Sequence, residues 1–145
     1  PIGTRWVDVN KGDEKAPEYR SRLVAQELKR LEDRDDTFAA TPPLEALKFI
    51  LSLCMTETRS ANRSYLSFLD VKRAHFHAPA TREVYVQLPP EDYAEGYCGR
   101  LNMSMYGTRD AAQNWEEAYS SFLVEIGFRR GLASPCMSSK EEPQG

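Results

Sequence analysis

The segment Asp110–Gly127, DAAQNWEEAYSSFLVEIG, carries the clearest fold signal in the chain. Spacings of three and four residues between apolar positions predict an amphipathic helix. Asp110 stands where a helix N-cap is preferred, and Gln113 follows three residues later in a capping-box arrangement. Gly127 stands where a left-handed C-terminal residue is expected. The apolar stripe consists of Ala111, Trp115, Ala118, Phe122 and Ile126.

A second helix is predicted upstream, from about residue 42 to about residue 58. Thr41 is a suitable N-cap, and Pro42 suits the first helical position because its missing N–H has no partner there. Apolar residues cover much of the circumference of this helix, so it is predicted to lie in the core. They are Leu44, Leu47, Ile50, Leu51, Cys54 and Met55.

Several strands are predicted around the two helices. The first apolar segment contains Trp6, Val7 and Val9. Basic and apolar residues alternate from Arg20 to Gln26, which predicts a strand with Arg20 and Arg22 on one face. Buried or half-buried strands are predicted further along the chain. The predicted strands after the first segment are Arg20–Gln26, Tyr65–Val71, Val84–Leu88 and Arg100–Tyr106.

The order of these elements is β, β, α, β, β, β, α, which predicts an α+β fold with a mainly antiparallel sheet packed against two main helices. Polar connections are predicted at Lys29–Asp36 and Thr58–Ser64, and no element is predicted in Cys136–Gly145. A length of 145 residues corresponds to about one domain. We expect the domain to span residues 1–136 and residues 137–145 to form a disordered polar tail.

Composition excludes several classes of protein. The net charge is −3 and the isoelectric point is about 5.5. These values exclude nucleic-acid binding by bulk positive charge but not by a local basic groove. The sequence has no run of 18 apolar residues, which predicts no membrane span, and no signal peptide is recognised at the N-terminus. Three widely spaced cysteines favour a reducing, intracellular setting, in a cytoplasmic particle or the nucleus.

Three groups of residues could carry chemistry. Asp70 ends an apolar run, where a carboxylate either binds a cation or accepts hydrogen bonds from the next turn. His75 and His77 have too few partners at suitable spacing to predict a zinc site. The third group is a stretch of basic residues. It forms either a solvated face or a phosphate-binding site, since arginine binds phosphate bidentately. It comprises Arg20, Arg22, Lys29, Arg30 and Arg34.

Short segments in a fixed order suggest a family. They are RWV at 5–7, YRSRLVA at 19–25, DTFA at 36–39, LDVKRA at 69–74, EVYVQLPP at 83–90, RL at 100–101, MYGTR at 105–109, Trp115 and GF at 127–128. Their order and spacing resemble the reverse transcriptase domain of copia-type LTR retrotransposon polyproteins. The resemblance implies the fingers and part of the palm of an RNA-directed DNA polymerase. It covers about residues 5–136.

The resemblance also implies roles for single residues. Asp70 would be the first catalytic carboxylate, binding two Mg²⁺ ions with help from the carbonyl of Val71. The implied nucleotide contacts are Arg20, Arg22, Lys72, Arg73, Ala74 and His75. The implied template and nucleotide pocket contains Tyr106, Gly107 and Arg109. The implied partners are an RNA or DNA template-primer, a deoxynucleoside triphosphate, the rest of the palm and thumb, and RNase H and integrase regions.

The chain departs from the family pattern at several positions. Arg73 and His75 replace an Asn and a Phe, and Asp110 and Ala112 replace a Gln and a Pro. Asp110 would weaken the binding of template phosphates unless it serves as the helix cap. The downstream aromatic-x-Asp-Asp hairpin, which completes the metal site in the family, is missing from the 145 residues. One carboxylate cannot hold two Mg²⁺ ions, so we expect this chain alone not to polymerise DNA.

One alternative follows from these departures, and another sets the resemblance aside. The first is a catalytically dead, decayed or co-opted descendant that only binds nucleic acid or protein. The second is a small α+β interaction module without an active site.

Overall fold

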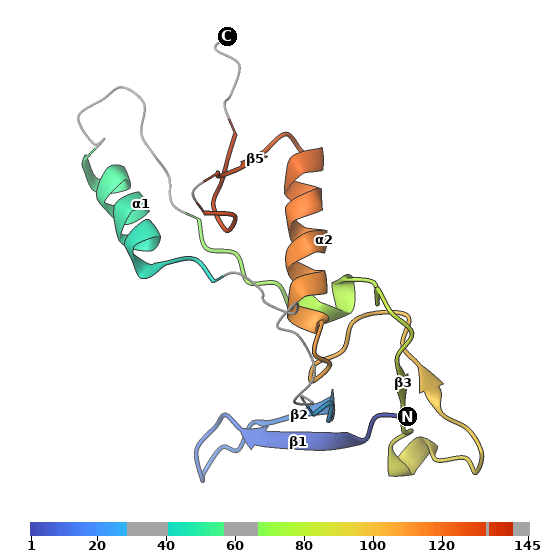
Figure 1. Cartoon of the computed structure of the whole chain (residues 1–145). Coiled ribbons are helices and arrows are strands. Elements are labelled where there is room, and N and C mark those ends of the chain that lie inside the picture. The colour runs from blue at the N-terminus through green and yellow to red at the C-terminus, as the bar shows by residue number, and fades with distance from the viewer. Residues whose placement is uncertain (29–40, 57–66, 133, 141–145) are drawn as a thin grey trace. The chain divides into compact units, whose positions relative to one another are not determined.

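The computed structural model describes residues 1–28, 41–56, 67–132 and 134–140. It is a mixed α+β structure, with two α-helices and three two-stranded antiparallel sheets in this part of the chain (Figure 1). The predicted connections at Lys29–Asp36 and Thr58–Ser64, with the basic residues Lys29, Arg30 and Arg34, lie outside the described residues. The chain divides into two compact units: unit 1 is Pro1–Ala39 with Arg73–Tyr119, and unit 2 is Ala40–Lys72 with Ser120–Gly145.

Unit 1 begins with a hairpin of β1, Thr4–Asn10, and β2, Tyr19–Ala25. Their antiparallel register places Trp6 opposite Leu23 and Val7 opposite Arg22. The strand predicted from the alternation at Arg20–Gln26 is therefore confirmed, with bounds shifted by one residue. Side chains alternate between the two faces of a strand, so Leu23 packs against the core while Arg22 is exposed.

A second sheet in unit 1 pairs β3, Tyr85–Val86, with β4, Gly99–Arg100. Both strands are shorter than predicted, but the alternation around β3 is correct. Val84 and Val86 are buried, and Tyr85 is exposed. The core of this unit contains Ala25, Val84, Val86 and Met105.

The predicted antiparallel pairing and the two helices are confirmed, but the prediction of a single sheet is wrong, because the described residues form three two-stranded sheets. Within unit 1, Ile2 joins two of them. Its N–H donates to the carbonyl of Tyr85 at 2.7 Å, and its carbonyl accepts from the N–H of Gln87 at 2.8 Å. The remainder of the predicted strand Arg100–Tyr106 is reduced to a single bridge between Met103 and Pro79.

Two 3₁₀ helices complete unit 1: η2, Ala74–His77, and η3, Pro90–Asp92. His75 and His77 therefore lie in a 3₁₀ turn.

Helix α2, Ala111–Glu125, confirms the strongest sequence prediction. It ends as predicted at Gly127, whose φ is +94°. The N–H of Gly127 donates to the carbonyl of Val124 at 3.0 Å, and that of Phe128 donates to Leu123 at 2.9 Å, which is the Schellman pattern. The apolar stripe of α2 is buried only at its N-terminal end, where Ala111 is 1% exposed, whereas Phe122 further along is 55% exposed.

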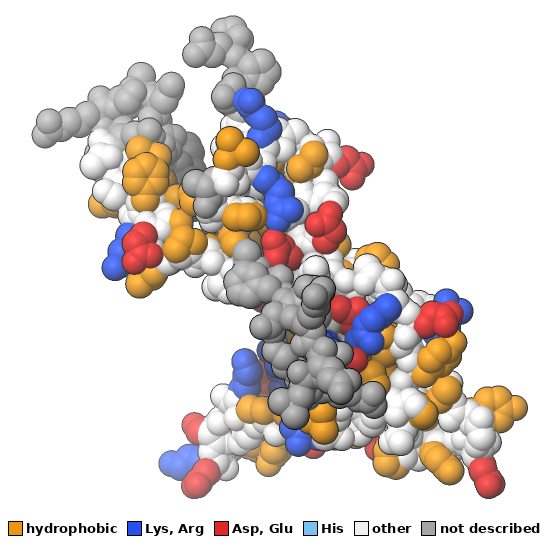
Figure 2. All heavy atoms as spheres, viewed as in Figure 1, with side chains coloured by type: hydrophobic (Ala, Val, Ile, Leu, Met, Phe, Trp, Pro, Cys, Tyr) orange, Lys and Arg blue, Asp and Glu red, His pale blue; other side chains and the backbone are white. Residues whose placement is uncertain are grey.

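Helix α1 of unit 2, Leu44–Thr56, begins two residues later than predicted, after Pro43. The prediction that it is a core helix is wrong, because no residue between Leu44 and Thr56 is buried. Figure 2 shows hydrophobic side chains gathered on its surface. Those exposed are Leu44, Leu47, Phe49, Ile50, Leu51, Leu53 and Met55.

Two further sequence expectations for unit 2 need correction. The predicted buried strand Tyr65–Val71 is wrong over its described part, since residues 67–71 form no strand and are exposed. Conversely, β5, Arg129–Arg130, pairs with β6, Ser138–Ser139, although the sequence predicts no element in either segment. No helix in the described ranges has the length and apolar character needed to cross a membrane.

Candidate functional site

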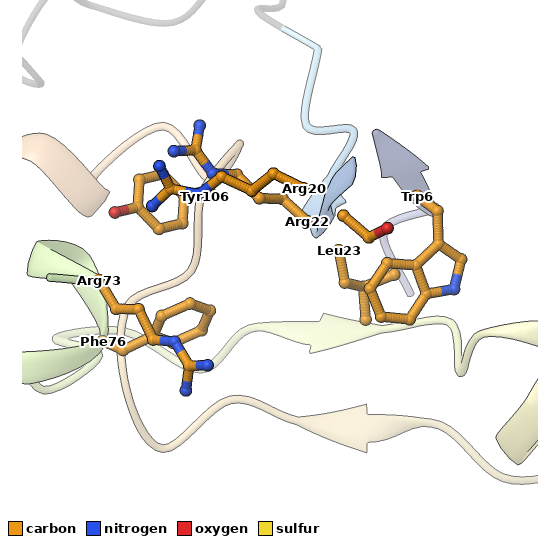
Figure 3. Close-up of a pocket in the computed structure, with 8 residues that line it drawn as sticks. Trp6, Arg20, Arg22, Leu23, Arg73, Phe76 and Tyr106 are labelled. Atoms are coloured by element: carbon orange, nitrogen blue, oxygen red, sulfur yellow. The ribbon is translucent and has the colours of Figure 1, made fainter. Parts of the chain in front are cut away.

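An open pocket of about 360 Å³ lies in unit 1, beside β2. That volume falls within the range of roughly 300–1,000 Å³ that is typical of small-molecule sites. Figure 3 shows Arg20 and Arg22 extending toward Tyr106, with Trp6 and Leu23 near the other end. The residues that line this arginine pocket are Trp6, Arg20, Ser21, Arg22, Leu23, Arg73, Phe76 and Tyr106.

The two arginines of β2 reach the pocket because of the strand periodicity. Positions 20 and 22 point to the same face, and the register sets them opposite Val9 and Val7 of β1. Arg73 adds a third guanidinium from a distant part of the sequence. Guanidinium groups present a planar fork of N–H donors that matches phosphate oxygens. Three of them at one pocket favour a ligand with several negative charges.

Tyr106 forms the aromatic part of the pocket. The guanidinium carbon of Arg22 lies 5.9 Å from the centre of the Tyr106 ring, within the range of a cation–π contact. The ring of His75 lies 4.4 Å away at a tilt of 35°, and Phe76 meets Tyr106 edge-on at 5.7 Å. Aromatic faces beside arginines are suited to stacking against a nucleobase.

Gly107 explains how Tyr106 comes so close to β2. The N–H of Ala25 donates to the carbonyl of Tyr106 at 2.8 Å, so this turn lies directly against the end of the strand. The φ of Gly107 is +88°, and a Cβ at this position would lie 1.9 Å from the carbonyl oxygen of Ala25. Only glycine fits here.

Arg73 has an unusual backbone. Its φ is 55° and its ψ is 42°, the left-handed region that residues with a side chain rarely adopt. Its carbonyl accepts a hydrogen bond from the N–H of Phe76 at 2.9 Å, which begins η2. This conformation brings Arg73 and Phe76 to the same pocket.

His75 lies behind Tyr106 and is partly buried. Its Nδ1 is fully buried and has no hydrogen-bond partner among the described residues. Burial lowers the pKa of His75 below its ordinary value of 6.5, because the charged imidazolium loses solvation. The neutral ring is therefore favoured beside Tyr106.

Asp110 is not among the residues that line the arginine pocket. It is 8% exposed, and its carboxylate accepts hydrogen bonds from Arg82 at 3.0 Å and from Asn114 at 3.2 Å. Burial by itself raises the pKa of Asp110, but the hydrogen bond from Arg82 and further hydrogen bonds outweigh it, so the pKa lies below the usual value. Asp110 immediately precedes α2, and its carbonyl accepts from the N–H of Asn114 at 2.9 Å.

The structure brings together four of the residues that the resemblance implied: Arg20, Arg22, Arg73 and Tyr106. His75 touches Tyr106, whereas Gly107 and Arg109 shape the turn and do not line the pocket. Sequence reasoning missed Trp6 and Phe76 as lining residues, although both are aromatics near predicted basic positions. It also missed the ion pair between Nη2 of Arg82 and Oε2 of Glu27, which are 2.6 Å apart, because residues 55 positions apart in the sequence give no local signal.

Ala74 is half-buried at the start of η2 in unit 1. The other implied site residues, Asp70, Val71 and Lys72, belong to unit 2, where all three are exposed. In residues 1–28, 41–56, 67–132 and 134–140, no group of three or more His, Cys, Asp or Glu side chains could hold a metal ion. Mg²⁺ takes oxygen ligands in octahedral geometry. A single carboxylate and one carbonyl do not fit a two-metal site.

Comparisons with known proteins agree with the resemblance. The family model described as reverse transcriptase (RNA-dependent DNA polymerase) matches residues 1–144. The retrovirus-related Pol polyprotein from transposon TNT 1-94 of Nicotiana tabacum is 29% identical over 148 residues, covering 97% of this chain and 11% of that protein. The Ty1-NL2 Gag-Pol polyprotein of Saccharomyces cerevisiae is 33% identical over 64 residues, covering 44% of this chain and 4% of that protein.

The truncated Ty1-A Gag-Pol polyprotein of Saccharomyces cerevisiae is 26% identical over 107 residues, which is 74% of this chain and 9% of that protein. The chain thus spans between 4% and 11% of the length of these three relatives. No solved structure matches the chain.

Proposed function

This chain belongs to the reverse transcriptase (RNA-dependent DNA polymerase) family, and on that premise we propose that its unit 1 binds the nucleotide and template of a copia/Ty1-type retrotransposon polymerase. In this proposal the described residues are part of the fingers and palm. The substrates are an RNA or DNA template-primer and a deoxynucleoside triphosphate. The rest of the palm and thumb, with RNase H and integrase regions, belongs to the same polyprotein.

The arginine pocket is the observation that carries the proposal. Arg20, Arg22 and Arg73 line one cavity with the rings of Trp6 and Tyr106. Phosphate contacts supply most of the affinity of a protein for nucleic acid, and aromatic faces add stacking with bases. The same cavity therefore offers both parts of a nucleotide a suitable partner.

In this proposal Arg20, Arg22 and Arg73 bind the phosphates of the incoming nucleotide or of the template. Lys72, Ala74 and His75 complete the proposed nucleotide contacts, and Gly107 and Arg109 support the pocket through their turn.

We assign the role of catalytic carboxylate to Asp70. In this assignment the backbone carbonyl of Val71 is an additional oxygen ligand. The family implies a metal-dependent polymerase, but the donor set described here does not fit two ions. We therefore derive no catalytic step through a metal.

A second candidate function is binding without catalysis. Its support is that, among the described residues, no acidic side chain lines the arginine pocket, so the pocket can hold a polyanion without a metal ion. A primer-extension assay separates the two candidates.

Binding is tested by fluorescence anisotropy with a labelled primer-template at several salt concentrations. We expect Arg20→Ala/Arg22→Ala to weaken binding. The logarithm of the association constant decreases linearly with the logarithm of the salt concentration. The magnitude of that slope should fall by about 0.7–0.9 for each phosphate that the variant no longer neutralises. Arg5→Ala is the matched control, because Arg5 is an exposed arginine of the same hairpin that does not line the pocket. Equal weakening in both variants, or no binding by the unmodified chain, would refute the assignment.

Catalysis is tested by primer extension with Mg²⁺ and the four deoxynucleoside triphosphates, resolved on a denaturing gel. We expect no extension by the 145-residue chain, because one carboxylate cannot coordinate two ions against water. Extension that disappears in Asp70→Asn would overturn this expectation.

A further inference from the structure

Three charged side chains form a network in unit 1, outside the arginine pocket. Nη2 of Arg82 lies 2.6 Å from Oε2 of Glu27 and 3.0 Å from Oδ1 of Asp110. The side chain of Arg82 is 41% exposed, whereas those of Glu27 and Asp110 are 14% and 12% exposed. Removing a shared partner from two nearly buried carboxylates leaves both underpaired.

The network extends into the turn that precedes α2. Oε2 of Glu27 also accepts the backbone N–H of Arg109 at 2.9 Å. Nδ2 of Asn114 donates to Oδ2 of Asp110 and, at 3.0 Å, to Oγ of Ser104. The turn is therefore fixed at both ends, at residue 104 and at residues 109–110.

Tyr106 lies inside this fixed turn. Besides the bond from Ala25 to the carbonyl of Tyr106, the N–H of Glu27 donates to the carbonyl of Gly107 at 3.3 Å. Glu27 thus holds the turn with both its backbone and its carboxylate, two residues after β2 ends. The side chain of Tyr106 leaves the turn toward Arg22 and His75.

We propose that Arg82 is a positioning residue for the arginine pocket: by holding Glu27 and Asp110 together, it fixes Tyr106 at the place where Arg22 and His75 contact its ring. Arg82 itself does not line the pocket. The consequence for ligand binding rests on the proposed function, whereas the consequence for Tyr106 does not.

The first test observes the ring of Tyr106 without any ligand. The protein contains two histidines, so the imidazole protons of His75 can be assigned by NMR with a His77→Gln variant. At a centroid distance of 4.4 Å, the ring current of Tyr106 shifts the His75 signals. In Arg82→Gln we expect these signals to move toward the values of an unstructured peptide, and in Arg82→Lys to move less.

The matched control is Arg100→Gln. Arg100 also pairs with a glutamate, Glu83 at 3.6 Å, but both side chains are more than 60% exposed. Exposed pairs contribute little to structure. We expect the His75 signals to stay at their original positions in Arg100→Gln.

The second test measures binding of a labelled single-stranded oligonucleotide. In Arg82→Gln we expect the affinity to fall about tenfold, because the ring of Tyr106 is misplaced. The salt slope should stay unchanged, because the same phosphates remain neutralised by the pocket arginines. A slope lower by about one would instead make Arg82 a direct phosphate ligand and overturn the proposal.

The outcomes separate this proposal from the proposed function. If the unmodified chain binds no oligonucleotide, the proposed function fails, and the His75 signals still decide the role of Arg82. If Arg82→Gln does not fold by circular dichroism, Arg82→Lys is compared instead. His75 signals that remain unchanged in the folded Arg82 variants refute the positioning role.

Discussion

At the scale of the residue, His75 carries an unfavourable feature. Its buried Nδ1 has no hydrogen-bond partner among the described residues, and a buried unpaired polar atom costs about 1–3 kcal/mol. We expect His75→Phe to raise the free energy of unfolding by about 1 kcal/mol, because a ring of similar size removes that nitrogen. Urea unfolding followed by circular dichroism measures the change.

The increase in the free energy of unfolding caused by His75→Phe should grow as the pH falls below 6.5. The unfolded chain protonates His75 near that value, whereas the folded chain does so only at lower pH, so protonation favours unfolding in this range. His77→Phe is the matched control, because His77 is exposed. An equal gain in both variants would show that the buried nitrogen is not the cause.

Gly107 supports a second prediction at this scale. Gly107→Ala combines a positive φ with a Cβ placed 1.9 Å from the Ala25 carbonyl oxygen, so we expect the free energy of unfolding to fall by more than about 2 kcal/mol. Gly96 provides the control, since its φ is +80° and nothing lies within 4 Å of its added Cβ. Gly96→Ala should cost only about 1 kcal/mol, the cost of the backbone conformation alone. Similar costs in the two variants, measured by urea unfolding, would contradict the close approach at Gly107.

The limits of sequence reasoning are visible at single residues. Arg20 and Arg22 could be placed on one strand face from local alternation, and the structure agrees. Arg82 could not be connected to its partners, because they lie 55 and 28 positions away in the sequence. No local period links residues at such separations, so the part that Asp110 plays in a charged network was missed.

At the scale of the element, the start of α2 depends on an ionised carboxylate. Hydrogen bonds to charged groups contribute about 1.5–3 kcal/mol. We expect Asp110→Asn to lower the free energy of unfolding by about 2 kcal/mol at pH 7, because it weakens the bonds from Arg82 and Asn114. Chemical unfolding at a series of pH values measures this difference.

The pH dependence has a definite sign. The folded-state pKa of Asp110 is lowered, so its contribution is complete above the ordinary value of 3.8 and disappears as the pH falls through the folded-state value. The free energies of unfolding of the unmodified chain and of Asp110→Asn should therefore converge as the pH falls below about 3.8. A constant difference across this range would show that ionisation of Asp110 is not involved.

Element predictions succeeded where the signal was local. The Schellman end of α2 follows from Gly127 and the residues immediately before it. The predicted strand at Tyr65–Val71 failed over its described residues because an apolar run specifies no pairing partner. Helix α1 was predicted correctly as a helix, but its apolar periodicity does not reveal what would cover it.

At the scale of the whole molecule, the α+β class could be predicted from the order of elements, whereas the sheet arrangement could not. Two of the three sheets in the described residues contain only two-residue strands, which are too short to show the alternation that predicts a strand. The net charge of −3 excluded binding by bulk positive charge, and the structure shows how a local alternative arises. Three arginines from two distant segments line one pocket despite the acidic total.

The arginine pocket also has a consequence for thermal stability. Guanidinium groups of like charge repel one another, and this repulsion opposes folding until an anion neutralises it. An anion that binds only the folded chain raises its stability by mass action, by about 1.4 kcal/mol at ten times its dissociation constant. We expect phosphate to raise the melting temperature more than chloride at equal ionic strength. Arg20→Ala/Arg22→Ala should narrow that difference to the general stabilising effect of phosphate, and Arg5→Ala should keep it in full.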